Sequence, residues 1–198
     1  MNDNLLPILG VSSGVLYLVS QIPYIRDIFR HNTKPQRATY WIWLVLNVIA
    51  FFAQLAAHAS WSLYFTGAQL LIVLSIAILS LHFGYGKFSR RDAVSLLIAL
   101  GGLVIWKLTK SPLIALLVVV GIDAVGFWLT LTKTWTAPRS ETLLTWCMDS
   151  AAALLGVLSV GSLSFTKLVY PLYIMLGNML LAFIIVYRRR FITRSSVQ

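Results

Sequence analysis

Two aspartates, Asp123 and Asp149, have the clearest capacity for chemistry in this sequence. The chain has 198 residues, 59% of them hydrophobic, and only six acidic side chains, yet these two acids lie in the middle of long apolar runs. No lysine or arginine lies near the middle of either run. A carboxyl group in a membrane interior is costly when charged and tolerated when protonated, so each aspartate is a candidate for proton coupling. The alternative is a protonated acid that joins two helices by a hydrogen bond.

A second group of polar and aromatic residues is expected at a similar depth. Trp43 and Asn47 are four residues apart and therefore share one face of a helix, and Trp146 and Ser150 repeat that spacing. Two tryptophan rings can hold the faces of a solute, and amides can bond its edges. The sequence thus predicts a solute-binding site formed by Trp43, Asn47, Gln69, Trp146, Ser150 and Asn178. The alternatives are tryptophans at the membrane interface and amides that join helices.

Seven apolar runs must position these residues. A membrane-spanning helix needs about 20 mostly apolar residues. Runs of this kind occur at Leu5–Phe29, Thr39–Ala59, Trp61–Tyr85, Arg91–Leu108, Ser111–Trp135, Glu141–Val160 and Phe165–Tyr187. A soluble domain of this size needs far more charged surface. We therefore expect an all-α integral membrane protein with seven transmembrane helices.

The basic residues indicate on which side of the membrane each loop lies. The net charge is +10, and thirteen of the sixteen Lys and Arg residues fall on one side of the expected spans. Cytoplasmic loops carry such an excess of basic residues. We expect the inner membrane of a prokaryotic cell, with the N-terminus outside and the C-terminus in the cytoplasm. The same distribution favours a lipid bilayer, and not nucleic acid, as the partner of the positive charge.

A displacement of 103 residues aligns two related motifs in the sequence. It brings Thr33, Pro35, Thr39 and Trp43 onto Thr136, Pro138, Thr142 and Trp146. The proline ends one helix, and the threonine after it is suited to cap the next. We expect two parallel three-helix repeats, residues 1–86 and 111–198, joined by a linker helix at 87–110. Parallel repeats are a transporter arrangement, with the solute site between the halves near the bilayer midplane.

The sequence Gln21-Ile22-Pro23 before a basic loop, together with the 3+1+3 pattern, resembles the PQ-loop superfamily, which includes the SWEET sugar carriers. The resemblance implies that Gln21 and Pro23 form a hinge motif, to which Gly126 corresponds in the second repeat. It also implies that Trp43, Trp146 and Asn178 contact the solute. The match is incomplete, since Pro23 is followed by Tyr24 where the family often has glutamine, and the third helix offers Gln69 where SWEET carriers have asparagine.

These features predict a transporter for a small polar metabolite (a sugar, an amino acid, or a vitamin or nucleoside) that works by alternating access, with possible proton coupling. The rival hypothesis is a membrane receptor or interaction protein on the same scaffold, as in the KDEL receptors. The sequence contains no metal-ligand spacing, phosphate-binding loop or nucleophile–base pair, so we expect neither an enzyme nor a cofactor. It leaves open whether the chain forms a homo-oligomer.

Overall fold

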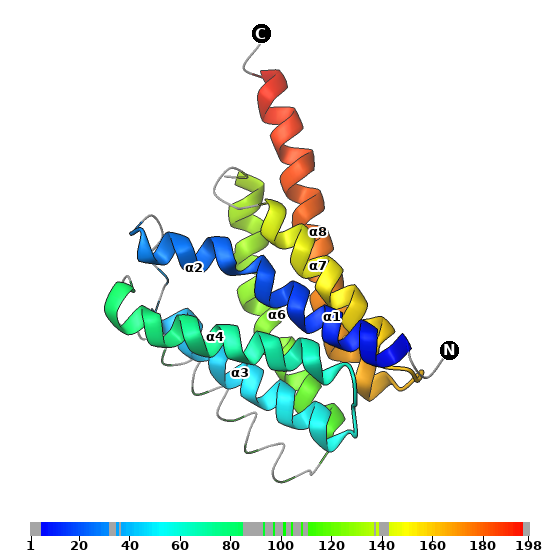
Figure 1. Ribbon diagram of the computed structural model, residues 1–198. Helices are drawn as coiled ribbons and strands as arrows, with labels where there is room; N and C mark the ends of the chain where they lie inside the picture. The colour runs from blue at the N-terminus through cyan, green and yellow to red at the C-terminus, as the bar shows by residue number, and fades with distance from the viewer. Residues whose placement is uncertain are drawn as a thin grey trace.

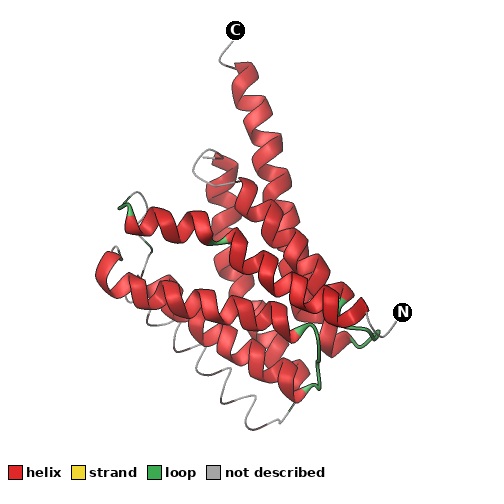
Figure 2. Cartoon of the chain, viewed as in Figure 1, coloured by secondary structure: helices red, strands yellow, loops and turns green. Residues whose placement is uncertain are grey.

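A computed structural model describes residues 5–31, 35, 37–84, 111–136, 138 and 143–195, together with the isolated positions 93, 97, 101, 104 and 108. Every regular element in these ranges is a helix (Figure 2). In chain order the elements are α1 (Leu5–Ser20), α2 (Ile22–Phe29), α3 (Arg37–Ala56), α4 (Leu63–Phe83), α6 (Pro112–Thr136), α7 (Leu143–Leu158) and α8 (Phe165–Ser195).

The first apolar run is interrupted at a single residue, Gln21, which separates α1 from α2. Pro23 lies in the first turn of α2, where its missing backbone N–H is tolerated but where it prevents one unbroken helix. The direction of α2 differs from that of α1 (Figure 1). At the corresponding position of the second repeat, α6 continues through Gly126 without a break. The bend is therefore present in the first repeat alone.

The start of α3 differs from the expected one. This helix begins at Arg37, so Thr39 lies within its first turn and does not precede it as a cap. The equivalent Thr142 lies outside the described residues. The helix starts earlier because Arg37 and Ala38 are themselves good helix formers.

Six helices form a closed ring in which each helix contacts two neighbours. The order around the ring is α1, α4, α3, α6, α8, α7 and then α1 again, with α2 continuing from α1 (Figure 1). We call α1 to α4 the first triplet and α6 to α8 the second triplet. The triplets meet at two places, which we call the α1–α7 seam and the α3–α6 seam.

Glycines allow close packing within the first triplet. A Cβ atom added to Gly10 would lie 2.4 Å from the carbonyl oxygen of Trp61, and one added to Gly14 would lie 2.8 Å from that of Tyr64. The backbones of α1 and α4 can approach this closely because neither glycine has a side chain.

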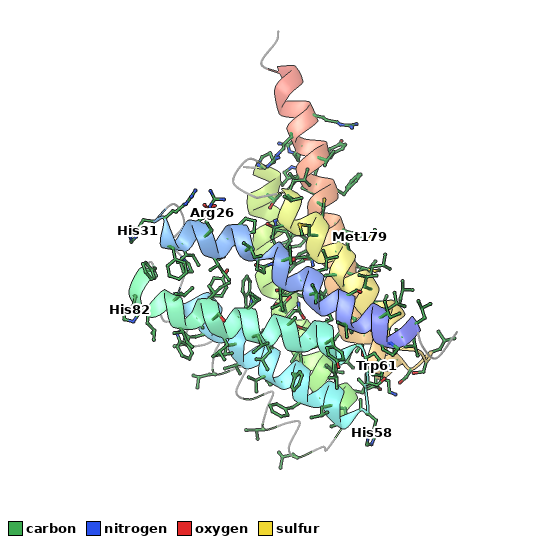
Figure 3. The ribbon with its side chains drawn as sticks, viewed as in Figure 1. Arg26, His31, His58, Trp61, His82 and Met179 are labelled. Carbon is green, nitrogen blue, oxygen red and sulfur yellow. The ribbon has the colours of Figure 1, made fainter. Side chains whose placement is uncertain are left out.

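The two ends of the ring differ in their residues. Arg26, His31 and His82 lie at one end, and Trp61 and His58 lie at the other (Figure 3). We call the first end the basic face and the second the N-terminal face, because α1 begins there. The α7–α8 connection also lies at the N-terminal face, since a Cβ on Gly161 would meet Leu6 at 2.7 Å.

The triplets are closer together at one face than at the other. At the basic face the end of α4 lies well apart from the ends of α6 and α8 (Figure 1). Close contacts between the triplets occur toward the N-terminal face, where Gly156 of α7 lies against Phe65 of α4. The triplets thus diverge toward the basic face.

Two apolar clusters fill the interior of the ring. One joins α3 to α6 and contains Leu46, Ile49, Ala50, Ala53, Ala115, Leu116, Val119 and Tyr170. The other joins α1, α4 and α7 and contains Tyr17, Ile28, Phe65, Ala68, Ile72, Ile76, Ala152 and Ala153. Ile174 of α8 packs against both clusters, so it lies between them.

Three stretches of helix are long and apolar enough to cross a membrane: Leu5–Phe29, Leu63–Phe83 and Phe165–Arg190. Shorter apolar stretches occur at Tyr40–Ala56, Pro112–Ala124 and Leu143–Leu158. The expected span Arg91–Leu108 falls almost entirely outside the described residues, as do most of the expected linker residues 87–110. The fold is therefore all-helical with three candidate membrane spans, and the seven-span arrangement stays a prediction.

Candidate functional site

Asp149 of α7 is bound by residues at the break between α1 and α2. It is 7% exposed, and its Oδ1 atom forms a hydrogen bond with the Ser20 hydroxyl. The side-chain amide nitrogen of Gln21 lies 3.1 Å from both carboxyl oxygens. The motif glutamine and one of the two aspartates therefore meet directly across the α1–α7 seam.

The Ser20 hydroxyl has two acceptors within reach but only one proton. Its oxygen lies 2.7 Å from the backbone oxygen of Tyr17, which can only accept. If the hydroxyl donates to Tyr17, its contact with Asp149 is a hydrogen bond only when the carboxyl group carries a proton and donates it. If Asp149 is charged, the single Ser20 proton can be donated to Tyr17 or to Asp149 but not to both, so one of these two oxygens receives no hydrogen bond from Ser20. All these contacts are satisfied together in the protonated state.

Tyr17 connects Asp149 with the rest of the interior. It is 8% exposed and lies near Gln69 of α4, Asp149 and Tyr170. Its own ring packs edge-on against Phe65, with centroids 5.6 Å apart. Gln69 is buried as well, and its Oε1 atom has no partner among the described residues.

Asp123 of α6 has a different environment from Asp149. The hydroxyl of Tyr173 on α8 donates to its Oδ2 atom over 2.6 Å, and Tyr170 lies within electrostatic range. Both tyrosines belong to the second triplet, as does Asp123. This hydrogen bond therefore stays within one triplet, whereas those of Asp149 join the two.

Asn47 has an unused acceptor. Its Nδ2 atom donates to the backbone oxygen of Trp43 over 2.9 Å, and this donation fixes which end of the amide is nitrogen. Its Oδ1 atom is buried and has no partner among the described residues. The ring of Trp43 packs edge-on against Tyr40 at 5.3 Å. A donor group of a solute or a water molecule could bond the free oxygen of Asn47.

The remaining expected residues have varied positions. Ser150 donates to the backbone oxygen of Met175 over 3.2 Å, so its hydroxyl joins α7 to α8. Asn178 is buried on α8, and Trp146 is half-buried on α7. A clamp between Trp43 and Trp146 stays a prediction, since the contacts of the described residues do not test it.

Four residues of this cluster were not predicted from the sequence: Ser20, Tyr17, Tyr170 and Tyr173. Ser20 immediately precedes Gln21, and this adjacency was a usable signal. Tyr170 and Tyr173 are three residues apart and so share a helix face, but that spacing is equally typical of packing. Among the described residues, no three His, Cys, Asp or Glu side chains come together as metal ligands would.

Comparison of the chain with protein-family models, with curated proteins and with solved structures gave no match.

Proposed function

We propose that this protein is a membrane transporter that moves a small polar metabolite by alternating access between its two triplets. The observation that carries the proposal is the buried polar cluster with one carboxyl group bonded across a seam. Tyr17, Gln69 and Asp149 belong to it, and the buried polar residues of the described chain include no lysine or arginine. Such groups are costly in a membrane unless they serve a solute or ion path.

The contacts around the ring support a two-fold repeat. The order of helices around the ring is unchanged when each helix is exchanged with its repeat partner: α1 with α6, α3 with α7, and α4 with α8. The same exchange turns the α1–α7 seam into the α3–α6 seam. It pairs the same helices as the 103-residue displacement in the sequence. Two agreeing relationships, one in sequence and one in space, favour parallel repeats over an unrelated bundle.

The positions of the helix ends support a linker between the triplets. The end of α4 lies at the basic face, since Phe83 packs against Phe29 at 5.6 Å. The start of α6 lies toward the N-terminal face, near the end of α3 (Figure 1), and Ala115, Leu116 and Ala53 belong to one buried cluster. An odd number of crossings must join these ends. We therefore retain the 3+1+3 arrangement, with a linker helix at 87–110, as part of the proposal.

The repeat also relates the two acids. At a displacement of 103 residues, Ser20 corresponds to Asp123 and Leu46 corresponds to Asp149. Each seam then has one acid, contributed by α7 at one seam and by α6 at the other. By this correspondence, the α3 residue that matches Asp149 is the apolar Leu46 and not an acid. Asp149 is therefore the stronger candidate for coupling protonation to movement of the triplets, because its bonds must change when they separate.

The proposal is tested first by identifying a solute. Purified protein is screened by thermal shift against sugars, amino acids, nucleosides and vitamins, and each stabilising compound is then tested for counterflow in proteoliposomes. We expect a compound that both stabilises the protein and exchanges across the bilayer. Binding without counterflow would favour the receptor hypothesis over transport. Failure of every class to bind or exchange would contradict the proposal.

A further inference from the structure

Phe65 of α4 is seated on Gly156 of α7. Phe65 is 0% exposed, and a Cβ atom placed on Gly156 would lie 3.1 Å from both its Cβ and Cγ atoms. The two helices belong to different triplets and are not neighbours in the ring, since α1 lies between them in its order. The contact therefore joins the two triplets directly, by α4 against α7, without α1 as an intermediary.

Tyr17 supports Phe65 from a third helix. Its ring meets that of Phe65 edge-on, with an interplanar angle of 82°. Ala152 and Ala153 of α7 belong to the same buried cluster. Three helices from two triplets therefore close together around one aromatic side chain.

This contact lies between the polar cluster and the N-terminal face. Phe65 is close to the start of α4 and Gly156 is close to the end of α7, and both of these helix ends are at that face. Asp149 precedes Gly156 by seven residues on α7, which corresponds to about 10 Å along a helix. A solute that moved from Asp149 toward the N-terminal face between α1, α4 and α7 would therefore meet Phe65.

We propose that Phe65, seated on Gly156 and supported by Tyr17, is the gate that closes the solute path at the N-terminal face. The inference rests on the proposed transport function. The helices of the two triplets diverge toward the basic face (Figure 1), so the Phe65–Gly156 contact joins them at the opposite end. Separation of the triplets at the N-terminal face requires Phe65 to leave Gly156. The Phe65 ring has no polar atom and Gly156 has no side chain, so this contact can break without leaving a side-chain polar group unpaired.

The two-fold repeat gives this gate a smaller counterpart. The displacement of 103 residues relates Phe65 to Leu168 of α8 and Gly156 to Ala53 of α3. The helices concerned, α3 and α8, are also in contact. Phe65 packs on Gly156 at the gate, whereas the equivalent pair is Leu168 and Ala53. The larger of the two corresponding side chains, that of Phe65, belongs to the first triplet.

The test measures access of water to the interior and needs no solute. In a Cys147→Ser background, Gln69→Cys provides a single reporter one helical turn deeper than Phe65. A membrane-impermeant maleimide is applied from the N-terminal face of oriented vesicles. We expect slow labelling of the reporter, and at least a tenfold faster rate when Phe65→Ala is added. Phe51→Ala is the matched control, because Phe51 also packs on a glycine, Gly67 at 3.4 Å, but within one triplet.

A second variant is needed in case Phe65→Ala does not fold, as judged by size-exclusion chromatography. Gly156→Ala places a methyl group against Phe65 and should raise labelling severalfold by displacing the ring. Gly177→Ala is its control, since Phe127 lies 3.3 Å from that position within the second triplet. Unchanged labelling in both gate variants, or equal increases in the controls, would overturn the gate. Failure of the transport proposal would be detected by a different measurement, namely the absence of solute counterflow in the unmodified protein.

Discussion

The side-chain amide of Gln21, at the break between α1 and α2, lies 3.1 Å from both carboxyl oxygens of Asp149 on α7. The hydrogen bonds join the point at which the first triplet bends to a carboxyl group of the second triplet. A change in the protonation of Asp149 alters which of its partners can donate and which must accept. The bend and the acid are therefore directly joined by hydrogen bonds.

Loss of the Gln21 amide should weaken the α1–α7 seam. We expect Gln21→Ala to lower the free energy of unfolding by about 0.6–2 kcal/mol, the range for hydrogen bonds between membrane helices. Thermal unfolding in detergent measures the effect. Ser75→Ala is the control, since Ser75 is exposed and bonds only the Leu71 oxygen of its own helix. Equal losses in the two variants would contradict a special role for the seam.

Asp149→Asn should separate exchange from accumulation. Asparagine resembles the protonated acid but cannot release a proton, so an imposed pH gradient, acidic at the N-terminal face, should no longer drive accumulation of the identified solute. Exchange down the solute's own gradient should persist. Asp27→Asn, on α2 near the basic face, should leave accumulation intact. If the unmodified protein ignores the pH gradient, Asp149 serves packing and the protein is a facilitator.

Tyr173→Phe tests the environment of Asp123 without removing the acid. The substitution deletes the hydroxyl that donates to Asp123 over 2.6 Å, so the charged carboxylate loses its identified donor. We expect pH-driven uptake to fall several-fold if Asp123 changes its charge during transport. The effect of Asp123→Asn should be smaller than that of Asp149→Asn, because the hydrogen bond of Asp123 does not join the triplets. A larger effect at Asp123 would reverse this assignment.

Trp43→Ala and Trp146→Ala should each reduce uptake of the identified solute at least tenfold while the protein still folds. Each removes one face of the expected clamp. Trp61→Ala should have little effect on uptake, because Trp61 lies at the N-terminal face and stacks on Tyr64 at 6.0 Å. Uptake assays in proteoliposomes, together with chromatography of each variant, make the comparison. Similar behaviour of all three would identify them as membrane anchors.

The orientation of the chain can be tested at exposed helix ends. In a Cys147→Ser background, we expect Ser60→Cys and Ser162→Cys to react with an impermeant reagent from outside the cell. His31→Cys and Arg190→Cys should be protected until the membrane is permeabilised, because cytoplasmic loops carry the basic residues. Labelling of Ser162→Cys and Arg190→Cys from the same side would exclude the proposed crossing of α8.

The sequence by itself determined that the chain is helical and apolar and that polar residues interrupt the apolar runs, and the family resemblance marked Gln21 and Pro23 as a hinge motif. These properties depend on local composition and on the stereochemistry of proline, which act within a few residues. The sequence also singled out Asp123 and Asp149, because an acid in an apolar run is conspicuous without any structure. It could not determine their partners.

Only the tertiary structure decided that Asp149 meets Gln21, that Asp123 meets Tyr173, and that Phe65 is seated on Gly156. These pairs are separated by 128 residues in the first case and 50 in the second, so no periodicity within one helix relates them. Each contact depends on the rotation of two helices about their axes and on the order in which the ring closes. Those quantities are set by packing of the described ring helices together, through close approaches such as that of Gly10 to Trp61. The two acids are therefore recognisable in the sequence, whereas the partner across a seam is a property of the assembled ring.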